Sequence, residues 1–341
     1  MGSGHLVRCL ALAEELLARG YQVQLLGDID QVPWALAEVE RLGIPRHPAT
    51  RTPEELVAAA RRLSLAAVVI DSYVLDPRCA GALRAAGVPV LAVVDGDLRG
   101  QEADLYLDQN LDAEAASPPL PPGATRLAGV RFALLRDVVR RRRPPAPRAP
   151  KAGVPTVVAF FGGTDPFGAA PVLARLLVAT GAPFTATVVT ATAHAAEEIA
   201  AIACGPGQRL TAIGNTPDLP GLVHTADLVV SAAGTSTWEL LCLGVCPALV
   251  RVAGNQRIGY DRMLARGLAV GLGAIDELRH PGPAADRAVR ELAALLADPA
   301  RRAEIAGRGW ALVDGAGRER VADALLAAID RRASLADAAR G

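Results

Sequence analysis

The chain has 341 residues, 51% of them hydrophobic, and its 36 basic and 36 acidic side chains give a formal net charge of +0 at pH 7. This length exceeds what one hydrophobic core usually organises, so two α/β domains are expected. The balanced charge argues against nucleic acid as a partner. We find no signal peptide and no apolar run long enough to span a membrane, and five scattered cysteines favour reduced thiols, so a cytoplasmic protein is expected.

The chain opens with Gly2, Ser3, Gly4 and His5, directly before a helical apolar pattern that starts at Leu6. A glycine-rich turn at a helix N-terminus can meet an anion or a reacting group. The helix dipole disfavours imidazolium, so a neutral His5 that accepts a proton is predicted; a purely structural histidine is the alternative. No strand precedes this turn, so we expect the first sheet either to have lost its first strand or to be built without one.

Short apolar runs alternate with helical patterns along the rest of the chain. The predicted strands are 21–26, 66–70, 89–94 and 105–107 in a first group, and 154–161, 184–190, 228–230 and 246–252 in a second. Continuous Val, Ile and Leu runs indicate strands buried on both faces. The pattern therefore predicts an α/β protein with parallel sheets covered by helices.

An Arg/Pro-rich stretch separates the two groups of strands. Residues 140–152 hold four consecutive arginines and a proline tract, which are typical of a solvated hinge. We therefore predict an N-terminal domain over 1–139, a linker over 140–152 and a C-terminal domain over 153–341 that ends in closing helices.

Three polar loops follow strands of the second domain. Gly234, Thr235 and Ser236 could hold a diphosphate at a helix N-terminus, and Glu239 could accept hydrogen bonds from ribose hydroxyls. The alternative is that Ser236 and Glu239 form only a capping box. Cys242 shortly beyond them is expected to be buried at a helix end rather than to bind metal with Cys246.

The other two loops carry Asn255 with Gln256, and Gly162-Gly163-Thr164-Asp165. As alternatives, Asn255 is simply a helix N-cap, and Asp165 caps a helix with Pro166 at its first position. Ligands of open α/β sheets bind at the carboxyl ends of the strands, so convergence of the three loops favours one binding crevice.

In the first domain, acidic and aromatic side chains follow predicted strands. Asp71 and Tyr73 follow one strand, and Asp95 and Asp97 follow another. These carboxylates could lie near His5 and orient it, although each is also an ordinary loop residue.

Taken together, these motifs resemble the family of the pseudaminic-acid-pathway UDP-sugar hydrolase and the spore-coat polysaccharide proteins, which is similar to the lipid-II-forming N-acetylglucosaminyltransferase. The motifs occur in order along almost the whole chain: Gly2-Ser3-Gly4-His5 with Arg8-Cys9-Leu10, Asp71-Ser72-Tyr73, Asp108-Gln109-Asn110, Gly129 with Leu134-Leu135-Arg136, Gly162 to Asp165, Ser231 to Glu239, and Asn255-Gln256. The resemblance implies the GT-B architecture, in which two Rossmann-like domains face each other and the second holds the nucleotide. Two departures are the missing strand before Gly2 and Asp95-Gly96 in place of paired aspartates.

The resemblance also implies a reaction. UDP would bind the Gly234 to Glu239 loop and the Asn255 region, the sugar would face the first domain, and His5, with Asp71 and Tyr73, would activate water for attack at the anomeric carbon. Gly4, Arg8 and Asn110 would contact the substrate, with no metal or cofactor. The nearest alternative is a glycosyltransferase with a carbohydrate or lipid acceptor; further alternatives are a non-catalytic nucleotide-sugar-binding protein and, least favoured, an NAD-dependent dehydrogenase, for which no Gly-x-Gly-x-x-Gly follows a strand.

Overall fold

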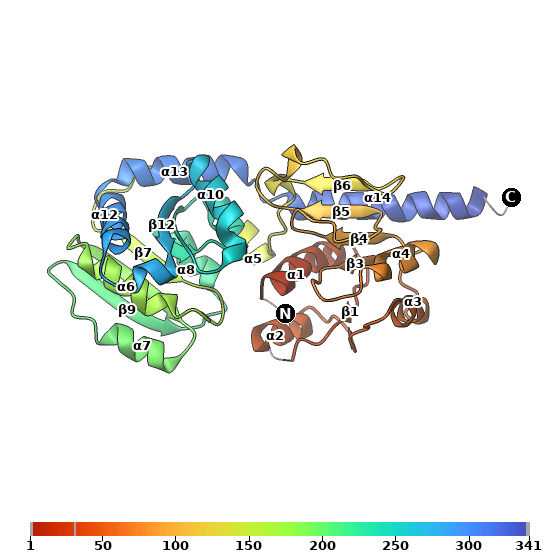
Figure 1. The fold of residues 1–341 in the computed structure, drawn as a ribbon, viewed down its shortest axis with the longest axis horizontal. Coiled ribbons are helices and arrows are strands. Elements are labelled where there is room, and N and C mark those ends of the chain that lie inside the picture. The colour runs from red at the N-terminus through yellow and green to blue at the C-terminus, as the bar shows by residue number, and fades with distance from the viewer. Residues whose placement is uncertain (1–2, 31, 339–341) are drawn as a thin grey trace. The chain divides into compact units, whose positions relative to one another are not determined.

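A computed structural model describes residues 3–30 and 32–338 of the chain. It is an α/β protein, as predicted, and it divides into two compact units (Figure 1). The first unit is Met1–Asp137 together with Gly315–Gly341, and the second is Val138–Asp314.

The strands of the first unit form two separate parallel sheets. β1 (Leu25–Leu26) pairs with β2 (Arg46–His47), and a four-stranded sheet runs β3 (Val68–Ile70), β4 (Val90–Val93), β5 (Leu105–Asp108) and β6 (Thr125–Ala128).

Helices cover both faces of the four-stranded sheet in the first unit. The helices of this unit are α1 (Ser3–Ala18), α2 (Pro33–Arg41), α3 (Pro53–Arg62), α4 (Arg78–Ala85) and α14 (Gly317–Ala338), with 3-10 turns at Ala113–Ala115 and Val130–Phe132. On one face, Leu12 of α1 and Leu325 of α14 share a core with Leu91 and Leu107 of the sheet. On the other face, Leu56 of α3 and Leu83 of α4 pack on alternate residues of the same strands.

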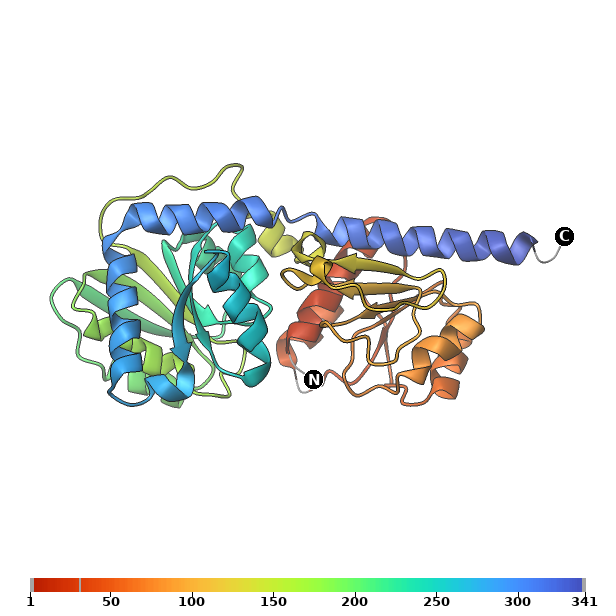
Figure 2. The ribbon, with the colours of Figure 1, turned by 45° about the horizontal axis from the view of Figure 1, so that its top comes forward.

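The C-terminal helix α14 therefore corrects the predicted domain boundary. It was expected to close the second domain, but it packs along the sheet of the first unit, beside α1 (Figures 1 and 2). A buried Arg318 at its start forms ion pairs with Glu14 at 2.9 Å and Glu15 at 3.1 Å. Apolar burial and these charges both attach α14 to α1.

The second unit is built around one six-stranded parallel sheet, in the order β12-β11-β10-β7-β8-β9. The strands are β7 (Thr156–Phe160), β8 (Phe184–Thr190), β9 (Gln208–Gly214), β10 (Leu228–Ala232), β11 (Cys246–Arg251) and β12 (Val270–Ala274). The helices are α6 (Ala169–Ala179), α7 (Ala193–Ala200), α8 (Leu219–Thr225), α9 (Thr237–Cys242), α10 (Arg257–Ala265), α11 (Ile275–Leu278), α12 (Pro283–Ala297) and α13 (Pro299–Leu312), with a 3-10 turn at Gly254–Gln256. Leu173 of α6 and Leu292 of α12 belong to the core on one face of this sheet.

The Arg/Pro-rich stretch is attached to the second unit and is not the solvated hinge that its composition predicts. It begins with the short helix α5 (Asp137–Arg140) and continues over the surface of α13. The Arg143 guanidinium lies 4.1 Å from the centre of the Trp310 ring and donates to the Trp310 carbonyl at 2.9 Å. Stacking and hydrogen bonding of this kind fix a chain segment in place.

Cys242 and Cys246 are both buried, as predicted, at the end of α9 and the start of β11. Burial raises the pKa of the Cys242 thiol to about 11 and that of the Cys246 thiol to about 12. Both therefore behave as small apolar groups at neutral pH. No helix among the described residues is long and apolar enough to cross a membrane.

Candidate functional site

In the first unit, polar side chains meet where β3, β4 and β5 end and α1 begins. Asp71 follows β3, Asp95 follows β4 and Asn110 follows β5, while His5 and Arg8 lie in the first two turns of α1. The three strands are parallel neighbours, so their carboxyl ends lie at one edge of the sheet. The structure thus brings together five residues that the sequence suggested separately. We call them, with Tyr73, the His5 cluster.

The buried carboxylate of Asp71 lies at the centre of the His5 cluster. His5 Nδ1 is 2.5 Å from Asp71 Oδ1, and Arg8 donates Nε–H and Nη2–H to the two carboxylate oxygens at 2.6 Å each. Burial raises the pKa of Asp71, but the hydrogen bonds from Arg8 and His5 lower it more, so the net shift is downward. An ionised Asp71 accepts from Nδ1–H and leaves His5 Nε2 as an acceptor.

The resemblance implies that Arg8 contacts the substrate, and in the structure its guanidinium is engaged by two carboxylates. It is 4% exposed, and its remaining Nη1 lies 3.4 Å from Asp95 Oδ1. Burial lowers the pKa of this guanidinium, but the hydrogen bond and charge of Asp71 raise it more, so the net shift is upward. Arg8 therefore holds Asp71 in place by a bidentate pair, which explains why an arginine is needed here.

Asp95 connects the other members of the His5 cluster. Its Oδ1 accepts from Asn110 Nδ2 at 3.1 Å, and its Oδ2 accepts from the Tyr73 hydroxyl. Burial raises the pKa of Asp95, but the Arg8 charge and the hydrogen bonds of Tyr73 and Asn110 lower it more. Burial and this carboxylate together raise the pKa of Tyr73 to about 12, so Tyr73 stays a phenol at neutral pH.

Tyr73 forms the solvent side of the cluster. Tyr73 is 56% exposed to solvent. Its ring meets the His5 ring edge-on, with 4.8 Å between the ring centroids. The Arg99 guanidinium lies 4.9 Å from the Tyr73 ring centre and donates to the Ser72 carbonyl at 2.5 Å. The loop after β3 is thus held in a defined position beside His5.

The neighbouring motif residues Asp108 and Gln109 have structural roles. Asp108 pairs with Arg126 at 3.0 Å, and Gln109 accepts from the Leu134 amide at 3.0 Å. Gly4, expected in a turn before the helix, lies within the first turn of α1, and Gly2 lies outside the described residues. Asn110 of the Asp108-Gln109-Asn110 motif belongs to the His5 cluster, and Asp108 Oδ1 accepts from Asn110 Nδ2 at 2.9 Å and so helps to hold it there.

In the second unit, the predicted loops gather at the carboxyl edge of the sheet, around the point where the strand order reverses. β7 lies beside β10, and from this pair the chain proceeds outward to β8 and β9 on one side and to β11 and β12 on the other. The crevice beside such a switch point is where open α/β sheets bind ligands.

The loop after β7 is exposed, as a binding loop must be, but Asp165 is engaged within it. Gly162 has a φ of 79°, which favours glycine, and the Gly163 carbonyl accepts from Asn215 Nδ2 at 2.9 Å. The Asp165 carboxylate accepts from the amides of Ala169 and Ala170 at 2.9 Å each. It therefore caps α6, as the alternative proposed, although the helix begins at Ala169 rather than at Pro166.

The loop after β10 lacks the predicted capping hydrogen bond. Ser236 is the N-cap residue of α9, but its side chain makes no capping hydrogen bond; the Thr237 hydroxyl donates instead to the Gly234 carbonyl at 2.7 Å. Glu239 lies in the first turn of α9, half-buried. Thr235 is exposed at the same edge. The capping-box alternative is thus wrong for the Ser236 side chain.

The loop after β11 lies against the loop after β10. Gln256 Oε1 accepts from the Val252 amide at 2.9 Å, and Gln256 Nε2 is 4.0 Å from the point where a Cβ on Gly234 would lie. Asn255 is exposed within the 3-10 turn and is not a helix N-cap, because α10 begins after Gln256.

Sequence reasoning missed Asn215, which follows β9 and ties two loops together at this edge. A lone asparagine after a polar strand gives no signal by itself. Ser231, the first residue of the Ser231 to Glu239 motif, lies on β10, and its buried hydroxyl has no hydrogen-bond partner among the described residues.

We compared the chain with protein-family models, curated protein sequences and solved structures. No protein-family model and no curated protein sequence matches the chain. Among solved structures, MurG from Acinetobacter baumannii is 17% identical with a TM-score of 0.71, the match covering 95% of this chain and 97% of that one. The glycotransferase of kitacinnamycin is 17% identical with a TM-score of 0.63 and covers 96% of each chain. LpCGTa in complex with UDP is 14% identical with a TM-score of 0.63 and covers 97% of each chain.

At these identities the likeness establishes the fold and nothing finer. The resemblance to the UDP-sugar hydrolase family is not confirmed by these comparisons and stays a prediction. The chain has the GT-B fold, two Rossmann-like domains with parallel sheets, over nearly its entire length.

Proposed function

We propose that the protein is a glycosyltransferase that uses a UDP-sugar donor and a hydroxyl-bearing acceptor. The observation that carries the proposal is the His5–Asp71 pair, with 2.5 Å between Nδ1 and Oδ1. A histidine held by a buried carboxylate is the arrangement that a general base for a hydroxyl requires.

In the proposed reaction His5 Nε2 takes the proton from the acceptor hydroxyl. The acceptor oxygen then forms a bond to the anomeric carbon of the donor, and the bond from that carbon to UDP breaks. Asp71 stabilises the imidazolium that forms, as a carboxylate partner does. Tyr73 is not the base, because its pKa is raised to about 12, but its phenol can hydrogen-bond to a substrate.

We assign UDP to the loops at the carboxyl edge of the sheet in the second unit. Gly162, Gly163 and Thr164 offer exposed backbone amides, and Gly234 with Thr235 begins the turn into α9. Glu239 and Gln256 would meet the ribose or the base, Ser236 the diphosphate and Asn255 the sugar. The proposal is supported by two solved structures of similar fold that contain UDP, those of LpCGTa and of MnaA from S. aureus.

Hydrolysis is the second candidate, and the ordered motifs of the hydrolase family favour it. The two reactions differ only in whether water or another hydroxyl accepts the sugar. The deciding experiment measures UDP release from a panel of UDP-linked sugars, with and without carbohydrate and lipid acceptors, and identifies the products by mass. Release that depends on an acceptor and yields a glycosylated product supports the transferase; equal release in water alone supports the hydrolase. UDP binding without release in either condition would contradict both.

A further inference from the structure

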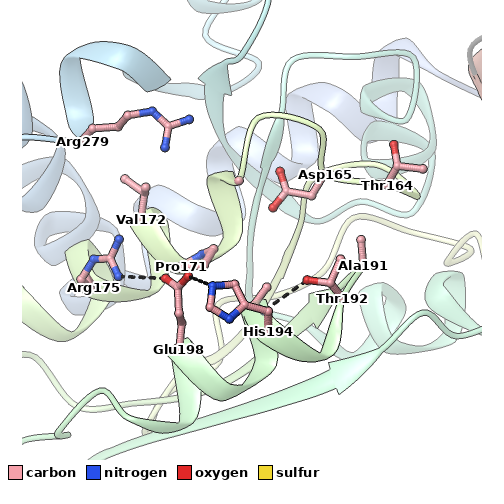
Figure 3. Close-up of a pocket in the computed structure, with 12 residues that line it drawn as sticks. Thr164, Asp165, Pro171, Val172, Arg175, Ala191, Thr192, His194, Glu198 and Arg279 are labelled. Carbon is pink, nitrogen blue, oxygen red and sulfur yellow. Dashed lines mark hydrogen bonds and ion pairs between the residues drawn. The ribbon is translucent and has the colours of Figure 1, made fainter.

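A cavity lies in the second unit, next to the loop that follows β7 and the loop that follows β8. It has a volume of about 260 Å³ and opens between α6, α7 and the end of α11. Figure 3 shows Pro171 and Val172 of α6 in its floor, Arg175 and Glu198 on one side and Arg279 above them. Neither the Gly234 loop nor the Asn255 loop lines it, but it shares Thr164 of the β7 loop with the proposed nucleotide site and so lies beside that site.

The acceptor groups of the cavity are already occupied. Both oxygens of the Asp165 carboxylate accept from the first amides of α6. Glu198 Oε1 accepts from His194 Nε2 at 3.0 Å, and the Thr192 hydroxyl accepts from the Ala195 amide at 3.2 Å. Each of these acceptors is therefore already engaged by a donor of the protein.

The donor groups, in contrast, are in surplus. Arg175, 54% exposed, has a single ion pair, with Glu198 at 3.6 Å, which is longer than a hydrogen bond. Arg279, 38% exposed, donates one Nη2–H to the Phe167 carbonyl and approaches Asp276 at 3.7 Å. Each guanidinium carries five N–H donors, so most of them remain for a ligand.

We propose that this cavity binds the oxyanion of a small molecule, a phosphate or a carboxylate, between Arg175 and Arg279. Two planar guanidinium groups beside an apolar floor match an acceptor-rich anion on a small organic body. Asp165 adds little opposing charge because the N-terminus of α6 compensates it. The site does not depend on the proposed transferase activity.

To test the proposal, the full chain is titrated in a calorimeter with inorganic phosphate and, separately, with citrate. Glucose serves as the uncharged probe. We expect saturable binding of at least one anion with a dissociation constant on the order of 1 mM or below, and none of glucose. Arg175→Gln and Arg279→Gln should each weaken it about fivefold or more, because each removes charge-assisted hydrogen bonds. Phosphate binding alone or citrate binding alone identifies which oxyanion the site takes.

The matched control is Arg209→Gln on β9, an exposed arginine of the same unit outside the cavity, which should leave binding within about twofold. Arg175→Lys keeps the charge but loses the planar fork, so it should bind more tightly than Arg175→Gln. The proposal is overturned by absence of saturable anion binding, by equal loss in the Arg209 control, or by unchanged anion affinity in Arg175→Gln and Arg279→Gln, which would put the anion elsewhere on the protein.

Discussion

Each charged residue of the His5 cluster is paired, so the removal of one leaves others without partners. Asp71 serves His5 and Arg8 at once, and Asp95 serves Arg8, Tyr73 and Asn110. Because each of these carboxylates accepts from several donors, one buried charge orients several side chains.

Asp95 is expected to act by positioning Tyr73 and Asn110 rather than by touching the reacting atoms. Asp95→Asn should lower kcat about tenfold and leave UDP affinity unchanged, because Asn keeps the shape but loses the charge that holds Arg8. Asp97→Asn is the matched control, since Asp97 only caps the Arg99 amide at 2.8 Å. Tyr73→Phe combined with Asp95→Asn should cost little more than either alone; additive losses in this double-mutant cycle would show that the two residues act independently.

The lowered pKa values of Asp71 and Asp95 predict how stability depends on pH. A carboxyl whose folded pKa lies below its unfolded value of 3.8 adds stability above that value and loses it as the pH falls through the folded pKa. Thermal unfolding followed from pH 7 down to pH 3 should therefore show a fall in Tm that begins near pH 4. Asp71→Asn should flatten part of that fall; a Tm that rises on acidification would contradict the assignment.

At the scale of elements, the predicted strands correspond to β1, β3, β4, β5, β7, β8, β10 and β11, whereas β2, β6, β9 and β12 were missed. Runs such as Val154 to Phe161 and Phe184 to Thr190 stand out because every position is apolar or β-branched. β9 alternates half-buried and exposed residues at the edge of its sheet, and β12 contains two glycines. Edge position and glycine both weaken the apolar pattern, so no signal separated these strands from loops.

The sequence also predicted several members of the His5 cluster, but it did not predict which side chains within the cluster contact one another. Asp71 and Asp95 were identifiable because each follows a strand, and the carboxyl ends of parallel strands converge; Asn110 was suggested only by the family resemblance. That Arg8 turns inward, or that Asp165 caps a helix four residues away, depends on side-chain direction and loop geometry. These are set by tertiary packing and leave no mark in spacing.

The start of α14 requires a glycine. A Cβ on Gly317 would lie 2.7 Å from the Ala133 nitrogen and closer still to its carbonyl oxygen, so the backbone would have to shift. Gly317→Ala should destabilise the first unit by about 1–3 kcal/mol, as overpacking does. Gly259→Ala on α10, where a Cβ would meet nothing within 4 Å, should be neutral or stabilising. Denaturant unfolding measures the free energy of unfolding of both variants. Equal stability of Gly317→Ala and Gly259→Ala would contradict the close contact between Gly317 and Ala133.

At the scale of the whole molecule, the chain leaves the first unit at Asp137 and returns to it at Gly315. The sequence pattern of Val321, Leu325 and Ile329 indicated a closing helix, which the sequence analysis assigned to the second domain and which instead packs on the first. The partner of an apolar helix face is a long-range property, and here Arg318 and Leu325 select α1 and the first sheet.

This arrangement predicts unequal behaviour of the two units when they are expressed separately. Residues 138–314 form one continuous unit and should fold alone with a cooperative unfolding transition. Residues 1–139 lack α14, so the core of the four-stranded sheet is left open on one face, and the fragment should show no cooperative transition. Thermal unfolding of both fragments is followed by circular dichroism. A cooperative transition in the 1–139 fragment would contradict the assignment of α14 to the first unit.

The central claim is that His5 is the base of a UDP-sugar transfer, and the most direct measurement compares His5→Ala with the native chain. We expect acceptor-dependent UDP release to fall by about 10²- to 10⁴-fold in His5→Ala, while the Kd for UDP, measured by calorimetry, stays the same. Normal turnover in His5→Ala, with UDP binding intact, would contradict it.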